Sequence, residues 1–182
     1  MSTWDWQSDA ELPVRVATTE DTEALAAIYR AAVEGTRDRS YSPQQVRAWL
    51  SLAPTPDQLA SLMTDGRLRL VATDEEYQPV GFVDLKPDGH VHYLYVHRDA
   101  GGSGLGATLL SAAVVAARRR GLELIYAEAS EAALRCFLRQ GFKQKERRDL
   151  SVAGVPIHNY GVELKLQSAP GNLDDRVREV PR

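Results

Sequence analysis

Hydrophobic and polar residues alternate along this chain in two different rhythms, and turn-forming residues separate one rhythm from the next. The pattern typical of β-strands, a period of two or a short apolar run between turns, occurs in four segments of the first half: 14–17, 67–73, 79–85 and 90–96. Polar turns at 74–78 and 86–89 separate the last three segments. We therefore expect these three strands to be antiparallel neighbours.

Helical patterns lie between the first strand and the second. After Asp21, which can cap a helix, apolar residues recur on one helical face: Leu25, Ile28, Tyr29 and Ala32. Ser42-Pro43 and Thr55-Pro56 each place a capping residue before a proline, the order that favours a helix start. The sequence therefore predicts one long helix and two short ones before residue 67.

The second half continues the alternation of helices and strands. It predicts helices at 104–120 and 131–140, a strand at 122–129, and two closing strands on either side of Ala153-Gly154. The fold class is therefore α/β, with a mixed, mostly antiparallel sheet and helices on both faces.

The chain of 182 residues fits one domain. We expect this domain to span residues 13–167, because the polar segments 1–12 and 168–182 show no sustained periodicity and are predicted to be flexible tails.

Composition and charge exclude several classes of function. A formal net charge of −3 does not favour binding to nucleic acid. The longest apolar run, near residues 109–117, is too short to cross a membrane, and the N-terminus lacks the pattern of a secretory signal. The single cysteine, Cys136, fits a reducing compartment. We therefore expect a cytoplasmic protein with no membrane or nucleic-acid partner and no bound metal.

A glycine-rich loop between the strand ending at Val96 and the following helix is the most informative segment. It comprises Gly101, Gly102, Ser103, Gly104, Leu105, Gly106 and Ala107. Such a loop leaves backbone N–H groups unpaired at a helix N-terminus, where the helix dipole also favours an anion. The loop therefore predicts a phosphate-binding site.

Two kinds of phosphate ligand can be weighed from the residues alone. A Walker loop needs Lys-Ser or Lys-Thr after its last glycine, but Ala107-Thr108 follows Gly106. The run from Gly102 to Ala107 does fit the G-x-G-x-x-A pattern of a dinucleotide site, with Glu128 about 20 residues further on. The hairpin before the strand and the single helix after 122–129 disfavour that alternative, a nicotinamide cofactor.

Coenzyme A is the third ligand considered. Over residues 13–166 the sequence resembles the GNAT superfamily of N-acetyltransferases. Gly104 and Gly106 match the last two positions of the family's signature loop, while Gly101 stands where the family has Arg or Gln. The segments 128–133 and 137–142 resemble the second family signature.

The resemblance implies a binding site for acetyl-coenzyme A. Leu94-Tyr95-Val96 is similar to the strand that diverges from its neighbour in the family and pairs its backbone with pantetheine. The residues implied in cofactor binding are Leu94, Tyr95, Val96, Gly101, Gly102, Ser103, Gly104, Leu105, Gly106, Ala107 and Ser130.

Acetyl transfer to an amine needs a proton acceptor, because amines are mostly protonated at neutral pH. The segment from Tyr41 to Trp49 resembles that of a branch of bacterial acetyltransferases within the superfamily. In that branch an acidic residue often occupies the position of His92, whose imidazole can accept a proton. Glu128 is a second candidate base. The family's usual proton donor is a tyrosine at the position of Phe137, which has no hydroxyl, and Cys136 is adjacent.

The predicted function is acetyl-coenzyme A-dependent transfer of an acetyl group to a primary amine of a small molecule or peptide. In such folds the N-terminal helices and the last hairpin bind the acceptor. The alternative is a non-catalytic module that binds or senses acyl-coenzyme A. A homodimer is compatible with either hypothesis.

Overall fold

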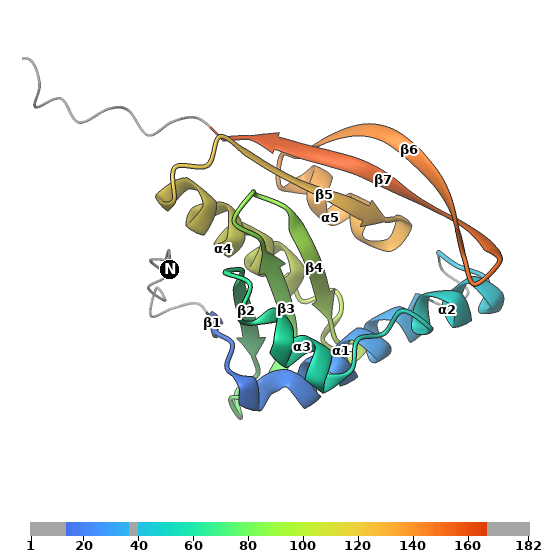
Figure 1. Ribbon diagram of the computed structural model, residues 1–182, viewed down its shortest axis with the longest axis horizontal. Coiled ribbons are helices and arrows are strands. Elements are labelled where there is room, and N and C mark those ends of the chain that lie inside the picture. The colour runs from blue at the N-terminus through green and yellow to red at the C-terminus, as the bar shows by residue number, and fades with distance from the viewer. Residues whose placement is uncertain (1–13, 37–39, 167–182) are drawn as a thin grey trace, which may run out of the picture.

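The computed structural model describes residues 14–36 and 40–166. Its strands form two antiparallel sheets, as Figure 1 shows. The first sheet has the order β1-β2-β3-β4, comprising Val14–Val16, Leu68–Thr73, Pro79–Leu85 and Val91–Val96. The second has the order β5-β7-β6, comprising Leu124–Ser130, Val155–Lys165 and Lys143–Val152.

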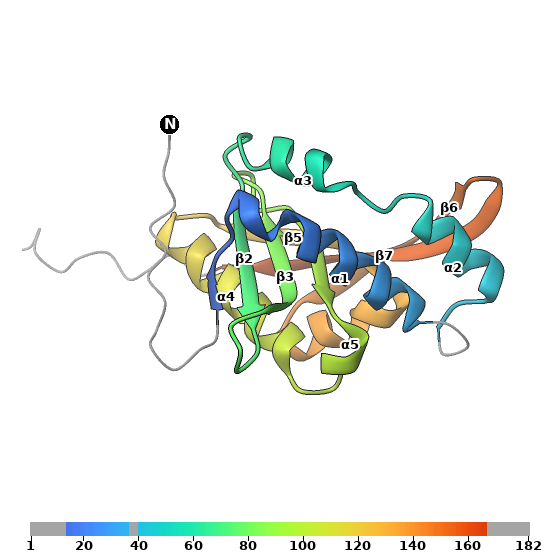
Figure 2. The same cartoon turned by 90° about the horizontal axis from the view of Figure 1, so that it is seen from below.

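Five helices cover the sheets: α1 (Thr22–Glu34), α2 (Pro43–Leu50), α3 (Pro56–Leu62), α4 (Leu105–Arg119) and α5 (Glu131–Arg139). Helix α1 packs against β3 and β4, and α3 packs against α1 (Figure 2). Helix α4 packs on the opposite face of the first sheet, and α5 packs against β5 and β7. The fold class predicted from the sequence is therefore confirmed.

Local sequence explains where the short helices begin. The Ser42 hydroxyl accepts the N–H of Gln45, whose side-chain oxygen accepts the N–H of Ser42. Thr55 and Gln58 repeat this reciprocal pair at the start of α3.

Asp21 lies at the N-terminus of α1, as the sequence predicts, but its carboxylate does not bond to that helix. The carboxylate instead accepts the Thr18 N–H at 2.7 Å and both ends of the Arg15 guanidinium. This arrangement caps the short turn before α1 and joins it to β1.

The apolar core is centred on α4, between the two sheets. Leu109, Leu110, Ala113 and Ala117 are fully buried, and they belong to one cluster with residues of β2, β3 and β5. Small alanines alternating with leucines let the helix approach both sheets closely. This helix therefore holds the two sheets together.

A buried ionic cluster lies on the other face of the first sheet. Asp84 of β3 is fully buried and accepts hydrogen bonds from the guanidinium groups of Arg67 and Arg69. Arg69 also donates to the carbonyl oxygen of Leu59 at 2.9 Å, which ties β2 to α3. The partly exposed Asp65 also pairs with Arg67, on the solvent side of this cluster.

Where both bounds of an element are predicted from the sequence, they agree with the observed bounds to within two residues. The predicted tails, 1–12 and 168–182, lie outside the described residues. Among the residues that are described, no helix is long and apolar enough to cross a membrane.

Candidate active site

Strands β4 and β5 diverge, and this is the feature that organises the site. A single parallel bridge, His90 with Tyr126, joins the two strands, and the Tyr126 N–H donates to the carbonyl oxygen of Gly89 at 3.0 Å. Beyond this bridge, among the strands of the described segments, β4 pairs only with β3 (Figure 1). We call the space between the diverging strands the splay.

The open edge of β4 presents backbone groups to the splay. The His97 N–H donates to Val80 on β3 at 2.8 Å, and bonding direction alternates along an antiparallel strand. The N–H and C=O groups of Leu94 and Val96 therefore point away from β3. Tyr95 differs, because its backbone faces β3 and its ring packs against Tyr29 with centroids 4.5 Å apart.

A β-bulge interrupts β4 at His92. Asp84 lies opposite Tyr93 and Leu85 lies opposite Val91, so His92 is the one residue of β4 without a partner on β3. The extra residue reverses the faces of the strand. Val91 packs in the core around α4, whereas Tyr93 packs on the side of α1.

The glycine loop runs from the short helix Arg98–Ala100 into α4. Gly102 and Gly104 have φ angles of 82° and 91°, which favour glycine, and a Cβ at either position would meet nothing within 4 Å. Within the described part of the chain, the N–H groups from Gly102 to Gly106 have no hydrogen-bond partner. The loop therefore presents a row of free donors at the N-terminus of a 15-residue helix.

Three other predicted cofactor residues have contacts within the protein. The Ser103 hydroxyl donates to the Ala100 carbonyl at 2.6 Å, and the Ala107 N–H donates to Gly104 at 2.9 Å. Ser130 caps α5 by accepting the Ala133 N–H at 3.2 Å. These groups shape the site, as does the N–H of Gly101, which donates to the Arg98 carbonyl at 3.1 Å, so the free donors are the N–H groups from Gly102 to Gly106.

Gly106 brings α4, β4 and α5 together. A Cβ built on Gly106 would lie 3.6 Å from the Cys136 sulfur and 3.8 Å from a Val96 methyl group. Cys136 is half-buried, and burial raises the pKa of its thiol. Phe137 is buried and packs edge-to-face on Phe142 with centroids 5.0 Å apart. Phe137 thus has no proton to donate, and the only ionisable group of the two is the Cys136 thiol.

His92 is a neutral imidazole at physiological pH. Burial, together with the positive charges of Lys86 and Arg67, lowers the pKa of His92 to about 4. Its ring lies 4.2 Å from that of Tyr93 and 5.7 Å from that of His90, measured between centroids. His92 can therefore accept a hydrogen bond, but it is a weak base.

Glu128 lies on β5 just beyond the bridge, and its side chain is 35% exposed. One carboxylate oxygen bonds to the Nε2 atom of His90 at 2.7 Å, and the other pairs with Arg148 of β6 at 3.0 Å. Both candidate bases thus lie near the closed end of the splay. The sequence analysis did not identify His90 or Arg148 as site residues. The only indication in the sequence was that His90 lies two residues before the candidate base His92.

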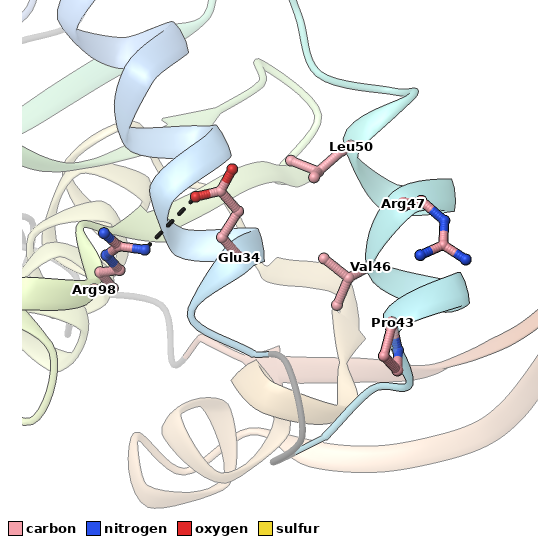
Figure 3. Close-up of a pocket in the computed structure, with 6 residues that line it drawn as sticks. All are labelled: Glu34, Pro43, Val46, Arg47, Leu50 and Arg98. Atoms are coloured by element: carbon pink, nitrogen blue, oxygen red, sulfur yellow. Dashed lines mark ion pairs between the residues drawn. The ribbon is translucent and has the colours of Figure 1, made fainter.

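A cavity of about 290 Å³ lies between the end of α1, α2 and the turn after β4. Figure 3 shows Val46 and Leu50 of α2 facing Glu34 of α1. Arg98 closes one side and pairs with Glu34 at 3.6 Å. The cavity thus lies beside the end of β4, on the side of the sheet that carries the N-terminal helices.

A divided sheet with free backbone donors beside the open strand can hold an elongated ligand that carries a phosphate at one end. A family profile described as an acetyltransferase (GNAT) domain matches residues 37–164. The chain therefore belongs to the GNAT family of N-acetyltransferase enzymes.

Solved structures agree with this assignment. A GCN5-related N-acetyltransferase from Rhodopseudomonas palustris is 32% identical, with a TM-score of 0.78 over 88% of this chain and 99% of that one. A putative acetyltransferase from Salmonella typhimurium, solved with acetyl-coenzyme A, is 23% identical with a TM-score of 0.62 over 90% and 98% of the two chains.

A phosphinothricin acetyltransferase from Sinorhizobium meliloti, also in complex with acetyl-coenzyme A, is 18% identical with a TM-score of 0.68 over 91% and 97% of the two chains. These last two similarities show the common fold. A comparison with curated protein sequences finds no match.

Proposed function

We propose that this protein transfers the acetyl group of acetyl-coenzyme A to a primary amine of a small molecule or peptide. The observation that carries the proposal is the open edge of β4 beside the free N–H groups of the glycine loop. An elongated ligand with a pyrophosphate at one end and amide groups along its length matches both features.

The cofactor is oriented by backbone groups. The N–H groups from Gly102 to Gly106 bind the pyrophosphate, aided by the dipole of α4. Leu94 and Val96 offer hydrogen bonds to the pantetheine amides along the splay. Acetyl-coenzyme A in two structures of similar fold supports this choice of cofactor.

The reaction requires three events at the closed end of the splay. The amine nitrogen bonds to the thioester carbonyl carbon, the carbon–sulfur bond breaks with its electron pair on sulfur, and the amine loses a proton. His92, neutral at physiological pH, accepts a hydrogen bond from the attacking amine and orients it. The Glu128 carboxylate is the candidate acceptor of the proton.

The acceptor amine enters from the side of α1, α2 and the β6–β7 hairpin. Gln45 of α2 donates to the Pro156 carbonyl at 3.0 Å, so helix and hairpin form one wall. Asn159 lies opposite Ser130 in the β5–β7 register, and its Oδ1 atom is buried without a hydrogen-bond partner among the described residues.

Acetyl-coenzyme A is expected to stabilise the folded protein, because it binds the native state and not the unfolded chain. At about 100 times its dissociation constant the ligand should add roughly 2.7 kcal/mol to the free energy of unfolding. Thermal denaturation with and without ligand measures this effect. A shift with nicotinamide dinucleotides and none with coenzyme A would contradict the proposal.

Turnover is tested by following free thiol release from acetyl-coenzyme A with a panel of primary amines and lysine-containing peptides. The proposal expects amine-dependent release with at least one member. Binding without release from any amine would instead support a non-catalytic acyl-coenzyme A module.

Replacing His92 with alanine is expected to lower kcat by about 100-fold while leaving cofactor affinity within a few-fold, because its imidazole contacts the acceptor. A neutral His92 is required, so its protonation should lower the wild-type rate as the pH falls through about 4. A plot of kcat against pH at saturating acceptor should show this fall in rate for the wild type and not for His92→Ala. The charged groups and imidazole around His92 are Lys86, Arg67, Asp84 and His90.

A further inference from the structure

Two residues that are distant in the sequence meet at the bridge between β4 and β5. His90 Nε2 and a Glu128 carboxylate oxygen are 2.7 Å apart, and the residues are 38 positions apart in the chain. The His90 side chain is 16% exposed, so the pair is largely buried but remains accessible to water. The pair therefore occupies the point from which the splay opens.

Neighbouring groups hold both partners in place. The His90 ring stacks on that of Tyr126 with centroids 5.0 Å apart and an interplanar angle of 17°, and the backbone N–H of His90 donates to Asp88 at 3.0 Å. Asp88 also accepts the Tyr126 hydroxyl at 3.1 Å. Arg148 holds the second oxygen of Glu128. The imidazole and the carboxylate are thus oriented by separate contacts.

The chemistry of the pair fixes which nitrogen of a neutral His90 is free. A carboxylate only accepts hydrogen bonds, so the ring proton lies on Nε2. Nδ1 then carries a lone pair, and it bonds to no residue within the described segments. An imidazole whose one nitrogen donates to a carboxylate and whose other nitrogen is free has the arrangement of a general base with its orienting partner.

We propose that His90 and Glu128 act as one unit in which His90 Nδ1 receives the proton of the attacking amine, directly or through one water, and Glu128 stabilises the imidazolium that forms. This inference rests on the proposed acetyl transfer and refines its proton acceptor. As the nitrogen–carbon bond forms, the proton moves to Nδ1 and the carbon–sulfur electron pair goes to sulfur. Proton release to the thiolate or to solvent restores the neutral imidazole.

The polar and charged surroundings of His90 come from four elements. They are Glu128 and Tyr126 on β5, His92 on β4, Asp88 in the preceding turn, and Arg148 on β6 through Glu128. The Glu128 carboxylate stabilises the positive charge that the ring acquires when it takes up the proton.

The test is a cycle of three variants, His90→Ala, Glu128→Gln and the double variant, assayed by thiol release with the best amine of the panel. Each single variant should lower kcat by about 100-fold or more. The double variant should be little worse than either single one, because residues that act as a unit lose their effect together.

A matched control is available in the same sheet. His158 forms an equivalent pair with Glu131 at 2.8 Å, on the side of α5. His158→Ala should retain wild-type kcat within a few-fold, which separates the proposed role from the loss of any histidine–glutamate pair. NMR of the ring nitrogens should show the Nε2–H tautomer for neutral His90.

Three results would overturn the inference. An active wild type with unchanged kcat in His90→Ala would remove the pair and leave the proposed acetyl transfer intact. Losses that multiply in the double variant would show two independent residues. A wild type that releases no thiol with any amine would refute the proposed function and the proton transfer with it.

Discussion

Gly104→Asp should abolish coenzyme A binding in a protein that remains folded. Gly104 has a φ of 91° and precedes α4, with free donors on both sides. Aspartate places a negative charge where the pyrophosphate binds and blocks its approach to the backbone. Loss of two charge-assisted hydrogen bonds, at about 1.5–3 kcal/mol each, corresponds to a fall in affinity of about 100-fold or more. Calorimetric titration with coenzyme A measures it.

Two controls separate the causes. Gly104→Asn has nearly the same size and tolerates the left-handed backbone, so it should lose less affinity than the charged variant. Gly121→Asp introduces the same residue at the other end of α4, where φ is 73° and no atom lies within 4 Å of a Cβ. That variant should bind coenzyme A normally. Normal affinity in Gly104→Asp would mean that the loop is only a turn.

Asp84→Ala should cause the largest loss of stability among single substitutions near the site. It leaves the buried guanidinium groups of Arg67 and Arg69 without their shared carboxylate. Breaking a buried ion pair from one side lowers the free energy of unfolding by about 3–5 kcal/mol. For a domain of this size, the melting temperature should fall by on the order of 10 °C.

Asp65→Ala is the matched comparison. Asp65 also pairs with Arg67, but its side chain is 40% exposed, and an exposed pair contributes about 0–1 kcal/mol. Chemical denaturation of both variants gives the two free energies. Equal losses would show that burial does not decide the strength of this cluster.

The helices and strands were predictable because their signals are local. Ser42-Pro43 and Thr55-Pro56 carry both cap and first turn within a few residues, and the structure uses both pairs in that way. Short turns join β2 to β3 and β3 to β4, so the antiparallel order of these three strands follows from their succession along the chain. Asp21 shows the limit, since its carboxylate bonds to Arg15 of β1 instead of capping its own helix.

The contacts between distant segments were not predictable. The pairing of His90 with Glu128 depends on where β5 meets β4, and that of Glu128 with Arg148 depends on the register of β6 against β7. The bulge at His92 depends on the alignment of β4 with β3. No local period encodes these alignments, because each follows from packing two sheets around α4.

The single bridge between β4 and β5 has a consequence for motion. In a continuous sheet, a change of angle between neighbouring strands breaks several ladder hydrogen bonds, each contributing about 0.5–1.5 kcal/mol. Here, within the described segments, the backbones of the two strands join only at the bridge, and elsewhere the two sheets are held together by side chains packed around α4. The two sheets can therefore change their mutual tilt without breaking a ladder of backbone hydrogen bonds, so the resistance to such a change comes from the packing around α4, with His90 and Glu128 at the pivot.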